Sequence, residues 1–204
     1  MIGIIDYGVG NLFSLRSSFE AIGVQTFVSG DAEELKKADK LILPGVGAFG
    51  DAAEKLRSTG LDAFVRQQAE KGVPLMGICL GMQLLFEKGY EYGEHEGLGL
   101  LKGSVISMKG KVPENLKIPH MGWNALHIVK PDSKLFAATQ EGEHVYFVHS
   151  FYADGCEDSL AATSEYGIPI TAAVEKGNIF GCQFHPEKSG TVGLGILRSF
   201  VLGG

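Results

Sequence analysis

Cys79 lies in a sequence that is typical of a catalytic nucleophile. The residues around it read VPLMGICLGMQ, so that Gly77 and Gly81 flank the cysteine two positions away on either side. An apolar run that predicts a strand ends at Ile78, and residues 80–86 are expected to form a helix. A strand–turn–helix elbow strains its middle residue and leaves no room for neighbouring side chains. Because a helix amino terminus favours the thiolate, the segment predicts a cysteine nucleophile.

A second segment, GCQFHPEK at residues 181–188, supplies the base that such a nucleophile needs. Pro186 disfavours helical geometry in the residue before it, so His185 is expected to be extended at a strand end. Side chains two residues apart in an extended segment point the same way, which predicts that Glu187 orients the imidazole toward Cys79. A buried structural cysteine and a structural histidine are the simpler alternatives. The two motifs together favour a Cys–His–Glu triad.

Attack of a thiolate on a carbonyl group creates an oxyanion, which requires preorganised N–H donors. The amide of Leu80, the residue after the nucleophile, is one expected donor. A second donor must come from another strand end, and the sequence PGVG at residues 44–47 follows a predicted strand. A plain tight turn is the alternative there. Residues 45–50 also have dinucleotide-binding spacing, but a predicted helix at 61–71 replaces the second strand and its acidic residue, so nucleotide binding is not favoured.

These residues are expected to be positioned by one α/β domain spanning residues 1–204. Strand-like runs at 2–5, 25–28, 41–43 and 75–78 alternate with amphipathic segments, and residues 31–34 read as a capping box. This alternation predicts an open, mostly parallel twisted sheet with helices on both faces. Such sheets gather their sites at the carboxyl ends of their strands. Cys79 and His185 both follow such ends.

The second half of the chain has a different pattern. It contains short strand candidates separated by turns, some of which are expected to be antiparallel extensions of the sheet, and the chain closes with a helix at about 191–202. These candidates lie at 103–108, 125–129, 145–148, 160–163, 171–175 and 179–184.

Composition narrows the class of protein. The chain has 204 residues, 45% of them hydrophobic, and a net charge of −6 without a basic cluster, so nucleic acid and anionic membrane surfaces are not expected partners. The amino terminus reads as a first strand rather than a signal, and no apolar run approaches membrane-spanning length. Three irregularly spaced cysteines favour a reducing cytoplasm over a disulfide framework. Metal-ligand motifs such as His-Glu-x-x-His and Cys-x-x-Cys are absent, so neither a metal nor another cofactor is predicted.

The motifs together resemble a known family. CLGMQ at residues 79–83 with HPE at 185–187 is similar to the triad-type, or class I, glutamine amidotransferases. Three further segments narrow the resemblance to the glutaminase subunits of imidazole glycerol phosphate synthase. They are DYGVGNL at 6–12, PHMGWN at 119–124 and YFVHS at 146–150. The resemblance covers the whole chain, with a small departure at Phe151, where the family often has tyrosine.

The resemblance implies a reaction and roles for residues in it. Glutamine would be hydrolysed to glutamate and ammonia through a glutamyl thioester on Cys79. Val46 would supply the second oxyanion donor, while Gly47, Gln83 and Ser150 would contact the substrate. Without the resemblance, Gln83 is an ordinary residue of a helix surface. His120 and His149 are expected to be structural or interface residues rather than metal ligands.

The resemblance also implies a partner. A separate (β/α)8-barrel cyclase would form a heterodimer with this chain, receive the ammonia through its barrel, and make imidazole glycerol phosphate and an aminoimidazole carboxamide ribotide in histidine biosynthesis. Glutaminase activity would stay low until this partner and its ligand bind, with a rearrangement of the Val46 loop as the switch. The expected interface residues are Asn11, Met121, Trp123 and Lys188.

Three alternatives remain open from the sequence. A different amidotransferase subunit of the same fold is disfavoured by the PHMGWN segment at residues 119–124. A cysteine hydrolase, such as a peptidase or a stress-protein relative, would share the elbow but fits the HPE segment and Gln83 poorly. A docking module without activity would not need an intact triad. Replacing Cys79 with alanine would leave such a module unaffected.

Overall fold

A central eight-stranded sheet organises the computed structural model, which describes residues 1–203. Its strand order is β2-β1-β3-β4-β14-β13-β12-β9. The pairs from β2 to β14 are parallel, and those from β14 to β9 are antiparallel. The prediction of an open, mostly parallel sheet with antiparallel extensions is therefore confirmed. The strands are β1 (Ile2–Ile5), β2 (Thr26–Ser29), β3 (Lys40–Leu43), β4 (Leu75–Ile78), β14 (Ile179–Cys182), β13 (Pro169–Lys176), β12 (Leu160–Glu165) and β9 (His127–Ile128).

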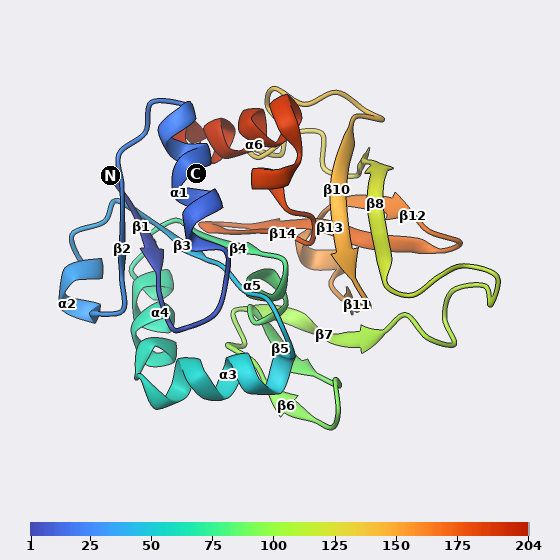
Figure 1. Ribbon diagram of the computed structural model, residues 1–204, viewed down its shortest axis with the longest axis horizontal. Coiled ribbons are helices and arrows are strands. Elements are labelled where there is room, and N and C mark those ends of the chain that lie inside the picture. Colours follow the sequence, from blue (N-terminus) through green and yellow to red (C-terminus); the bar gives the residue numbers. More distant parts are fainter. Residues whose placement is uncertain (204) are drawn as a thin grey trace.

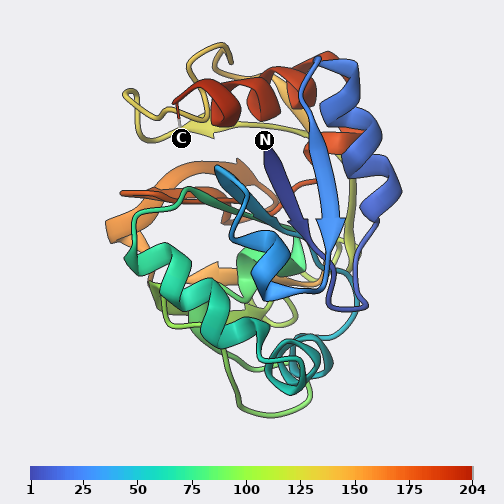
Figure 2. The same cartoon turned by 90° about the vertical axis from the view of Figure 1, so that its left-hand side faces the viewer.

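Helices cover both faces of this sheet, as Figures 1 and 2 show. Helices α1 (Leu12–Ala21) and α6 (Gly190–Gly203) lie on one face, and α3 (Phe49–Ser58) and α4 (Leu61–Glu70) lie on the other. Alternation along β3 explains why both faces are apolar: Ile42 belongs to the hydrophobic core under α1 and α6, whereas its neighbours in β3 belong to the core over α3 and α4. A short helix, α2 (Ala32–Leu35), connects β2 to β3.

Two smaller sheets extend the fold beside the central one (Figure 1). One has the order β11-β7-β5-β6, and the other pairs β10 with β8 in antiparallel register. These strands carry the segments that close the site from the side opposite β4 and β14. Their bounds are β5 (Phe86–Gly89), β6 (His95–Glu96), β7 (Leu101–Ser107), β8 (His120–Ala125), β10 (His144–His149) and β11 (Phe151–Asp154).

The helix predicted at residues 80–86 was too long. Helix α5 spans only Leu80–Gln83, and Phe86 begins a strand, paired with Leu101 in the second sheet. Phe86 is fully buried there, so sheet pairing and burial outweigh the helical pattern. A single turn has only a small dipole, so α5 does little to favour the thiolate of Cys79.

Other boundaries also needed correction. Asp31 caps α2 by accepting a hydrogen bond from the amide of Glu33, but Glu34 accepts one from the hydroxyl of Ser29 and does not close the predicted capping box. The single strand expected at 125–129 is divided between the end of β8 and β9. Helix α3 and strands β5, β6 and β11 were not predicted. Among residues 1–203, no helix combines the length and apolarity needed to cross a membrane.

Candidate active site

Cys79 occupies a strained turn between β4 and α5. Its backbone torsions are φ 55° and ψ −114°, an unfavourable combination for a residue with a side chain. The turn requires glycine because a Cβ atom on Gly81 would lie 1.8 Å from the carbonyl oxygen of Leu43. The amide of Cys79 donates a hydrogen bond of 2.7 Å to the carbonyl oxygen of Cys182, which fixes the turn against the end of β14. The chain thus holds one thiol at the carboxyl edge of two adjacent parallel strands.

His185 and Glu187 meet, but not for the reason that the sequence suggested. Residues Pro186–Lys188 form a 3₁₀ turn, so the segment is extended only as far as His185, whose torsions are φ −99° and ψ 98°. Proline keeps the preceding residue extended and starts the turn, which then folds Glu187 back. His185 Nδ1 lies 2.8 Å from Glu187 Oε1. Both side chains are buried, with 4% and 2% of their surfaces exposed, so this contact is shielded from solvent.

The electrostatic environment favours a protonated His185. Burial alone would lower its pKa, but hydrogen bonds with Cys79 and Glu187, and the charges of both groups, raise the pKa to about 9. Within residues 1–203, the second oxygen of Glu187, Oε2, is buried without a hydrogen-bond partner. The carboxylate is therefore directed at the imidazole. This arrangement suits an imidazolium that donates from Nε2 toward the sulfur and from Nδ1 toward the carboxylate.

A pocket of about 350 Å³ opens in front of this trio. Cys79 and His185 line it, while Glu187 lies behind the imidazole and does not. All five residues expected to form the oxyanion hole or to contact substrate also line the pocket, namely Val46, Gly47, Leu80, Gln83 and Ser150. The structure thus brings these predicted side chains and loops around one cavity. Their individual roles stay predictions.

The loop at residues 44–47 is held against the nucleophile turn by close backbone packing. A Cβ atom on Gly45 would lie 2.7 Å from the amide nitrogen of Gly81, so glycine is needed for this approach. Gly47 has φ +95°, which also favours glycine. The hydroxyl of Tyr7 donates a hydrogen bond of 2.7 Å to the carbonyl oxygen of Pro44 and anchors the loop from the end of β1.

Gln83 is buried, and its amide group is largely engaged within the protein. Its Nε2 donates to the carbonyl oxygen of Phe151 over 3.1 Å and to Gln183 Oε1 over 2.9 Å. A glutamine amide has two N–H donors, so both are used. The group that Gln83 can offer to a substrate is therefore its carbonyl oxygen, a hydrogen-bond acceptor. This polarity was not visible in the sequence.

Two groups of pocket residues were missed by the sequence analysis. Glu91, from the loop after β5, lines the pocket and accepts a hydrogen bond of 2.8 Å from the amide of Phe49. It is the one acidic residue among those lining this pocket. Pro119, Val148, His149 and Phe151 line it as well. Glu91 lies in a polar loop without a motif, so no sequence signal singled it out.

His120 and His149 form a buried pair beside the pocket. His120 Nδ1 lies 3.0 Å from His149 Nε2, and His149 Nδ1 lies 2.8 Å from the carbonyl oxygen of Phe151. Because a carbonyl oxygen only accepts, His149 carries its proton on Nδ1 and receives one hydrogen bond from His120. Burial lowers the pKa of His120 to about 4 and that of His149 to about 3. Both imidazoles are therefore neutral at neutral pH.

The four residues expected to face a partner are all exposed in this structure. Trp123 and Met121 on β8 have 56% and 61% of their surfaces exposed. Trp123 contacts the ring of Tyr146 edge-on, and the amine of Lys188 lies 6.0 Å from the centre of the same ring. The side chain of Asn11 accepts a hydrogen bond from the amide of Ser14 and so caps α1. Trp123, which was expected at a partner interface, thus lies on the surface.

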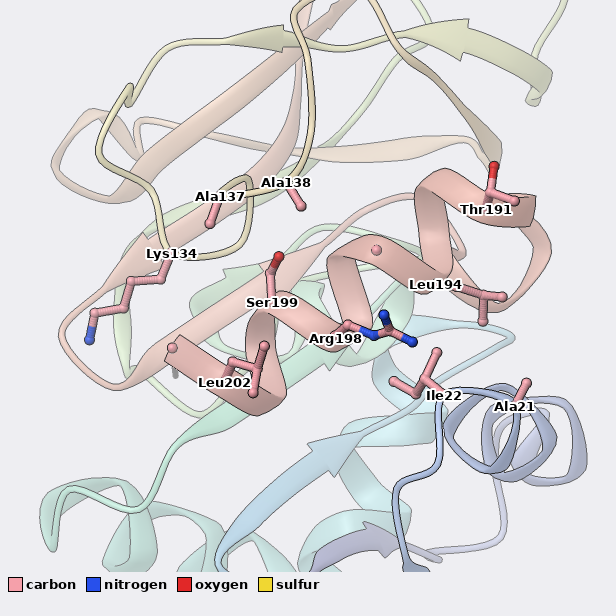
Figure 3. Close-up of a pocket in the computed structure, with 12 residues that line it drawn as sticks. Ala21, Ile22, Lys134, Ala137, Ala138, Thr191, Leu194, Arg198, Ser199 and Leu202 are labelled. Atoms are coloured by element: carbon pink, nitrogen blue, oxygen red, sulfur yellow. The ribbon is translucent and has the colours of Figure 1, made fainter.

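A larger pocket, which shares no lining residue with the first, lies between α6, the end of α1 and the loop around Lys134 (Figure 3). Its volume is about 570 Å³, and Ile22, Leu194 and Leu202 make much of its lining apolar. Arg198 and Lys134 are the charged residues that line it. No cysteine, histidine or carboxylate is among its lining residues, so the candidate active site is the smaller pocket. Among residues 1–203, no group of three or more histidine, cysteine or acidic side chains is arranged to hold a metal ion.

Comparison with other sequences gives matches over nearly the whole chain. The family described as "Glutamine amidotransferase class-I" matches residues 3–203. The curated protein "Imidazole glycerol phosphate synthase subunit HisH" of Geobacillus kaustophilus is 54% identical, with 98% of this chain and 96% of that protein covered. The protein of the same name from Bacillus subtilis is 52% identical, with 98% and 95% covered.

Solved structures with the same fold are more distant in sequence. A structure described as PurLQS from Thermotoga maritima has a TM-score of 0.76 and 24% identity, with 98% of this chain and 97% of that chain covered. The glutaminase domain of Trypanosoma brucei CTPS, with bound acivicin, has a TM-score of 0.67 and 17% identity, with 98% and 93% covered. At these identities the likeness concerns the fold.

Proposed function

This chain belongs to the class-I glutamine amidotransferase family, and on that premise we propose that its Cys79 pocket hydrolyses glutamine to glutamate and ammonia for an imidazole glycerol phosphate synthase. The observation that carries the proposal is the position of Cys79. Cys79 has a strained backbone, and its thiol lies in a pocket beside His185. The Nδ1 atom of His185 lies 2.8 Å from Glu187 Oε1. A hydrolase that passes through a thioester requires this combination.

The first half of the reaction forms the thioester. The proton of Cys79 passes to His185 Nε2, and the sulfur attacks the side-chain carboxamide carbon of glutamine. The amides of Leu80 and Val46 receive the developing oxyanion. The tetrahedral intermediate then collapses, the C–N bond breaks, and His185 gives its proton to the departing nitrogen, which leaves as ammonia. Glu187 keeps the imidazole oriented throughout.

The second half of the reaction releases glutamate. His185 takes a proton from a water molecule, whose oxygen attacks the thioester carbon. The C–S bond then breaks, and the proton on His185 passes to the departing sulfur, which regenerates the Cys79 thiol and the neutral imidazole. The pocket also offers groups suited to the rest of the substrate. The carboxylate of Glu91 and the free carbonyl oxygen of Gln83 are acceptors for the α-ammonium or amide N–H groups, whereas Gly47 and Ser150 lie where they can bind the remaining polar atoms.

The ammonia is passed to a partner subunit. At neutral pH free ammonia becomes ammonium and loses its nucleophilic lone pair, so direct transfer is an advantage. We infer a separate (β/α)8-barrel cyclase that forms a heterodimer through the exposed surface of Asn11, Met121, Trp123 and Lys188. Val148, which lines the pocket, pairs with Met121 across the β8–β10 register, so this surface adjoins the site. The cyclase then uses the ammonia to make imidazole glycerol phosphate and aminoimidazole carboxamide ribotide.

The setting of the reaction follows from the same features. Among residues 1–203, all three cysteines are free, which supports a reducing cytoplasm. The net charge of −6 disfavours nucleic acid and anionic membrane surfaces as partners. Glutaminase activity is low without the cyclase and its ligand, and a rearrangement of the Val46 loop completes the oxyanion hole when both are bound.

The test is glutamate release from glutamine by this chain, alone and with a barrel cyclase plus its ribonucleotide ligand. Strong stimulation by the partner, abolished by Cys79→Ala, is the expected result. Equal activity with and without the partner would retain glutamine hydrolysis but contradict the proposed partner. Unchanged function in Cys79→Ala would contradict the chemistry and leave a docking module.

A further inference from the structure

Gln183 is buried against the nucleophile and has no role in the mechanism described so far. It follows β14 and is 0% exposed, and its Nε2 lies 3.8 Å from Cys79 Sγ. Its neighbours Cys182 and Phe184 pack in the hydrophobic core under α1 and α6. Gln183 and His185 both interact with the side chain of Cys79, so the two groups adjoin the same sulfur.

The polarity of the Gln183 amide is determined by a chain of hydrogen bonds. The carbonyl oxygen of Phe151 can only accept, so the atom of Gln83 that faces it must be the nitrogen, Nε2. The same nitrogen lies 2.9 Å from Gln183, so the facing atom of Gln183 must be its oxygen, Oε1. The remaining end of that amide, Nε2, consequently faces Cys79. The carbonyl oxygen of Phe151 therefore determines which end of the Gln183 amide faces the sulfur, and that end carries the N–H groups.

A main-chain carbonyl group near the sulfur of Cys79 has the opposite polarity to the Gln183 amide. The carbonyl oxygen of Val148 lies 4.0 Å from Cys79 Sγ and can accept a hydrogen bond from the thiol, but it offers nothing to a thiolate. An N–H donor strengthens its interaction when the acceptor becomes charged. Gln183 thus favours the state in which the thiol proton has moved to His185 and the electron pair has stayed on sulfur.

We propose that Gln183 is a further catalytic residue, whose amide N–H donates to the sulfur of Cys79 and stabilises its thiolate during attack. A role of Gln183 in catalysis rests on the proposed function, whereas its stabilisation of the Cys79 thiolate does not. Gln83 acts through Gln183 as a positioning residue, because its Nε2 fixes the amide. A substrate that binds the free carbonyl oxygen of Gln83 would thereby contact the same network that holds the nucleophile.

The test replaces Gln183 with methionine, which has a similar length and no N–H donor. Alkylation of Cys79 by iodoacetamide is followed from about pH 6 to about pH 10, a range that spans ordinary thiol ionisation. The label is located on Cys79 by mass spectrometry. Gln183→Met is expected to slow alkylation about tenfold near pH 7, and the rates should converge at high pH, where the thiol is ionised in either case.

Two further variants separate this role from packing. Thr171→Val removes another buried polar group. The hydroxyl of Thr171 donates a hydrogen bond of 2.8 Å to the carbonyl oxygen of Ala153 and not to Cys79, so this variant should leave the alkylation profile unchanged. Gln83→Met removes the group that orients Gln183, and should shift the profile in the same direction by a smaller factor. If Gln183 only anchors Gln83, then Gln183→Met raises the KM for glutamine and leaves the alkylation profile as in the wild type. That result overturns the proposal.

A second measurement decides the question if Gln183→Met does not fold. The side-chain amide signal of Gln183, assigned by NMR in the wild type, should move as Cys79 ionises and lose this response in Cys79→Ala. A signal that is indifferent to both changes overturns the proposal. Failure of the proposed function would give a different result from failure of the Gln183 proposal. The wild-type chain would then release no glutamate in the presence of the cyclase and its ligand, whatever the alkylation profiles are.

Discussion

The hydroxyl of Tyr7 donates a hydrogen bond of 2.7 Å to the carbonyl oxygen of Pro44, joining the end of β1 to the loop expected to bind the oxyanion. Tyr7 is 4% exposed, and burial raises the pKa of its hydroxyl, so the group remains a neutral donor. Tyr7 begins the glycine-rich segment that leads to Asn11, an expected partner contact. Pro44 begins the loop that carries Val46 to the pocket, so the bond connects the two segments. The loop's position therefore depends on a side chain outside it.

Removing this hydroxyl should weaken both the fold and the reaction. Tyr7→Phe leaves the Pro44 carbonyl without its partner, at a cost of about 1–3 kcal/mol in the free energy of unfolding. A misplaced loop should also lower kcat for glutamate release more than it changes KM. Tyr166→Phe is a matched control, because its hydroxyl makes an exposed 2.7 Å bond to the carbonyl oxygen of Lys117. Equal losses in both variants would contradict the anchoring role.

The protonation of His185 should depend on Cys79. Burial lowers the pKa of His185, while the hydrogen bonds and charges of Cys79 and Glu187 raise it to about 9. In Cys79→Ala the pKa should fall, as measured by NMR titration of the imidazole. A raised pKa stabilises the folded state fully below about pH 6.5, and this contribution is lost as pH rises through about 9. Because Glu187 still raises the pKa in the variant, the alkaline decline in stability should become smaller. Cys182→Ala should change neither quantity.

Replacing Glu187 with glutamine should separate orientation from charge. The amide oxygen can still accept from His185 Nδ1, but the imidazolium loses its buried counter-charge, so its pKa should fall. We expect kcat for glutamate release to drop by about 10²- to 10⁴-fold, the range for an impaired general acid or base, with little change in KM. A variant that keeps the wild-type kcat would show that Glu187 has only a packing role.

The neutral pair of His120 and His149 should make the fold sensitive to acid. Burial lowers their pKa values to about 4 and about 3, against about 6.5 in an unfolded chain. Between these values the unfolded state binds more protons, so their contribution is complete above pH 6.5 and declines as pH falls through about 4. Unfolding free energies measured from about pH 7 to about pH 4.5 should show this loss. A His120→Asn variant should show a shallower slope over the same range, and an unchanged slope would contradict the assignment.

Trp123 should contribute to partner binding without supporting the fold. Its side chain is 56% exposed and contacts the ring of Tyr146 edge-on, so Trp123→Ala should leave the unfolding free energy within about 0.5 kcal/mol. A large aromatic side chain at an interface is often a dominant contact, so the Kd for the cyclase should rise by at least about tenfold in a binding titration. Val129→Ala, at another half-exposed apolar position, serves as the control and should bind as the wild type does.

Much of the central fold was predictable because its signals are local. Apolar runs of four residues predicted β1 and β4, and the helices predicted at 61–71 and at about 191–202 correspond to α4 and α6. The helix predicted at residues 80–86 failed for a reason that is not local. Helix α5 stops after Gln83 because Phe86 is drawn into pairing with Leu101, a contact between elements that the local pattern does not encode.

By itself, the sequence determined which residues are the candidates for the chemistry: a cysteine between glycines that admit a strained turn, and a His-Pro-Glu segment whose proline sets the local backbone. Only the tertiary structure decided how they meet. A 3₁₀ turn, and not strand alternation, brings Glu187 to His185. The oxygen of Phe151 fixes the polarity of Gln83 and Gln183, and Glu91 reaches the pocket from a loop without a motif. Motifs record constraints within a few residues, whereas hydrogen-bond polarity and pocket membership depend on partners up to a hundred residues apart.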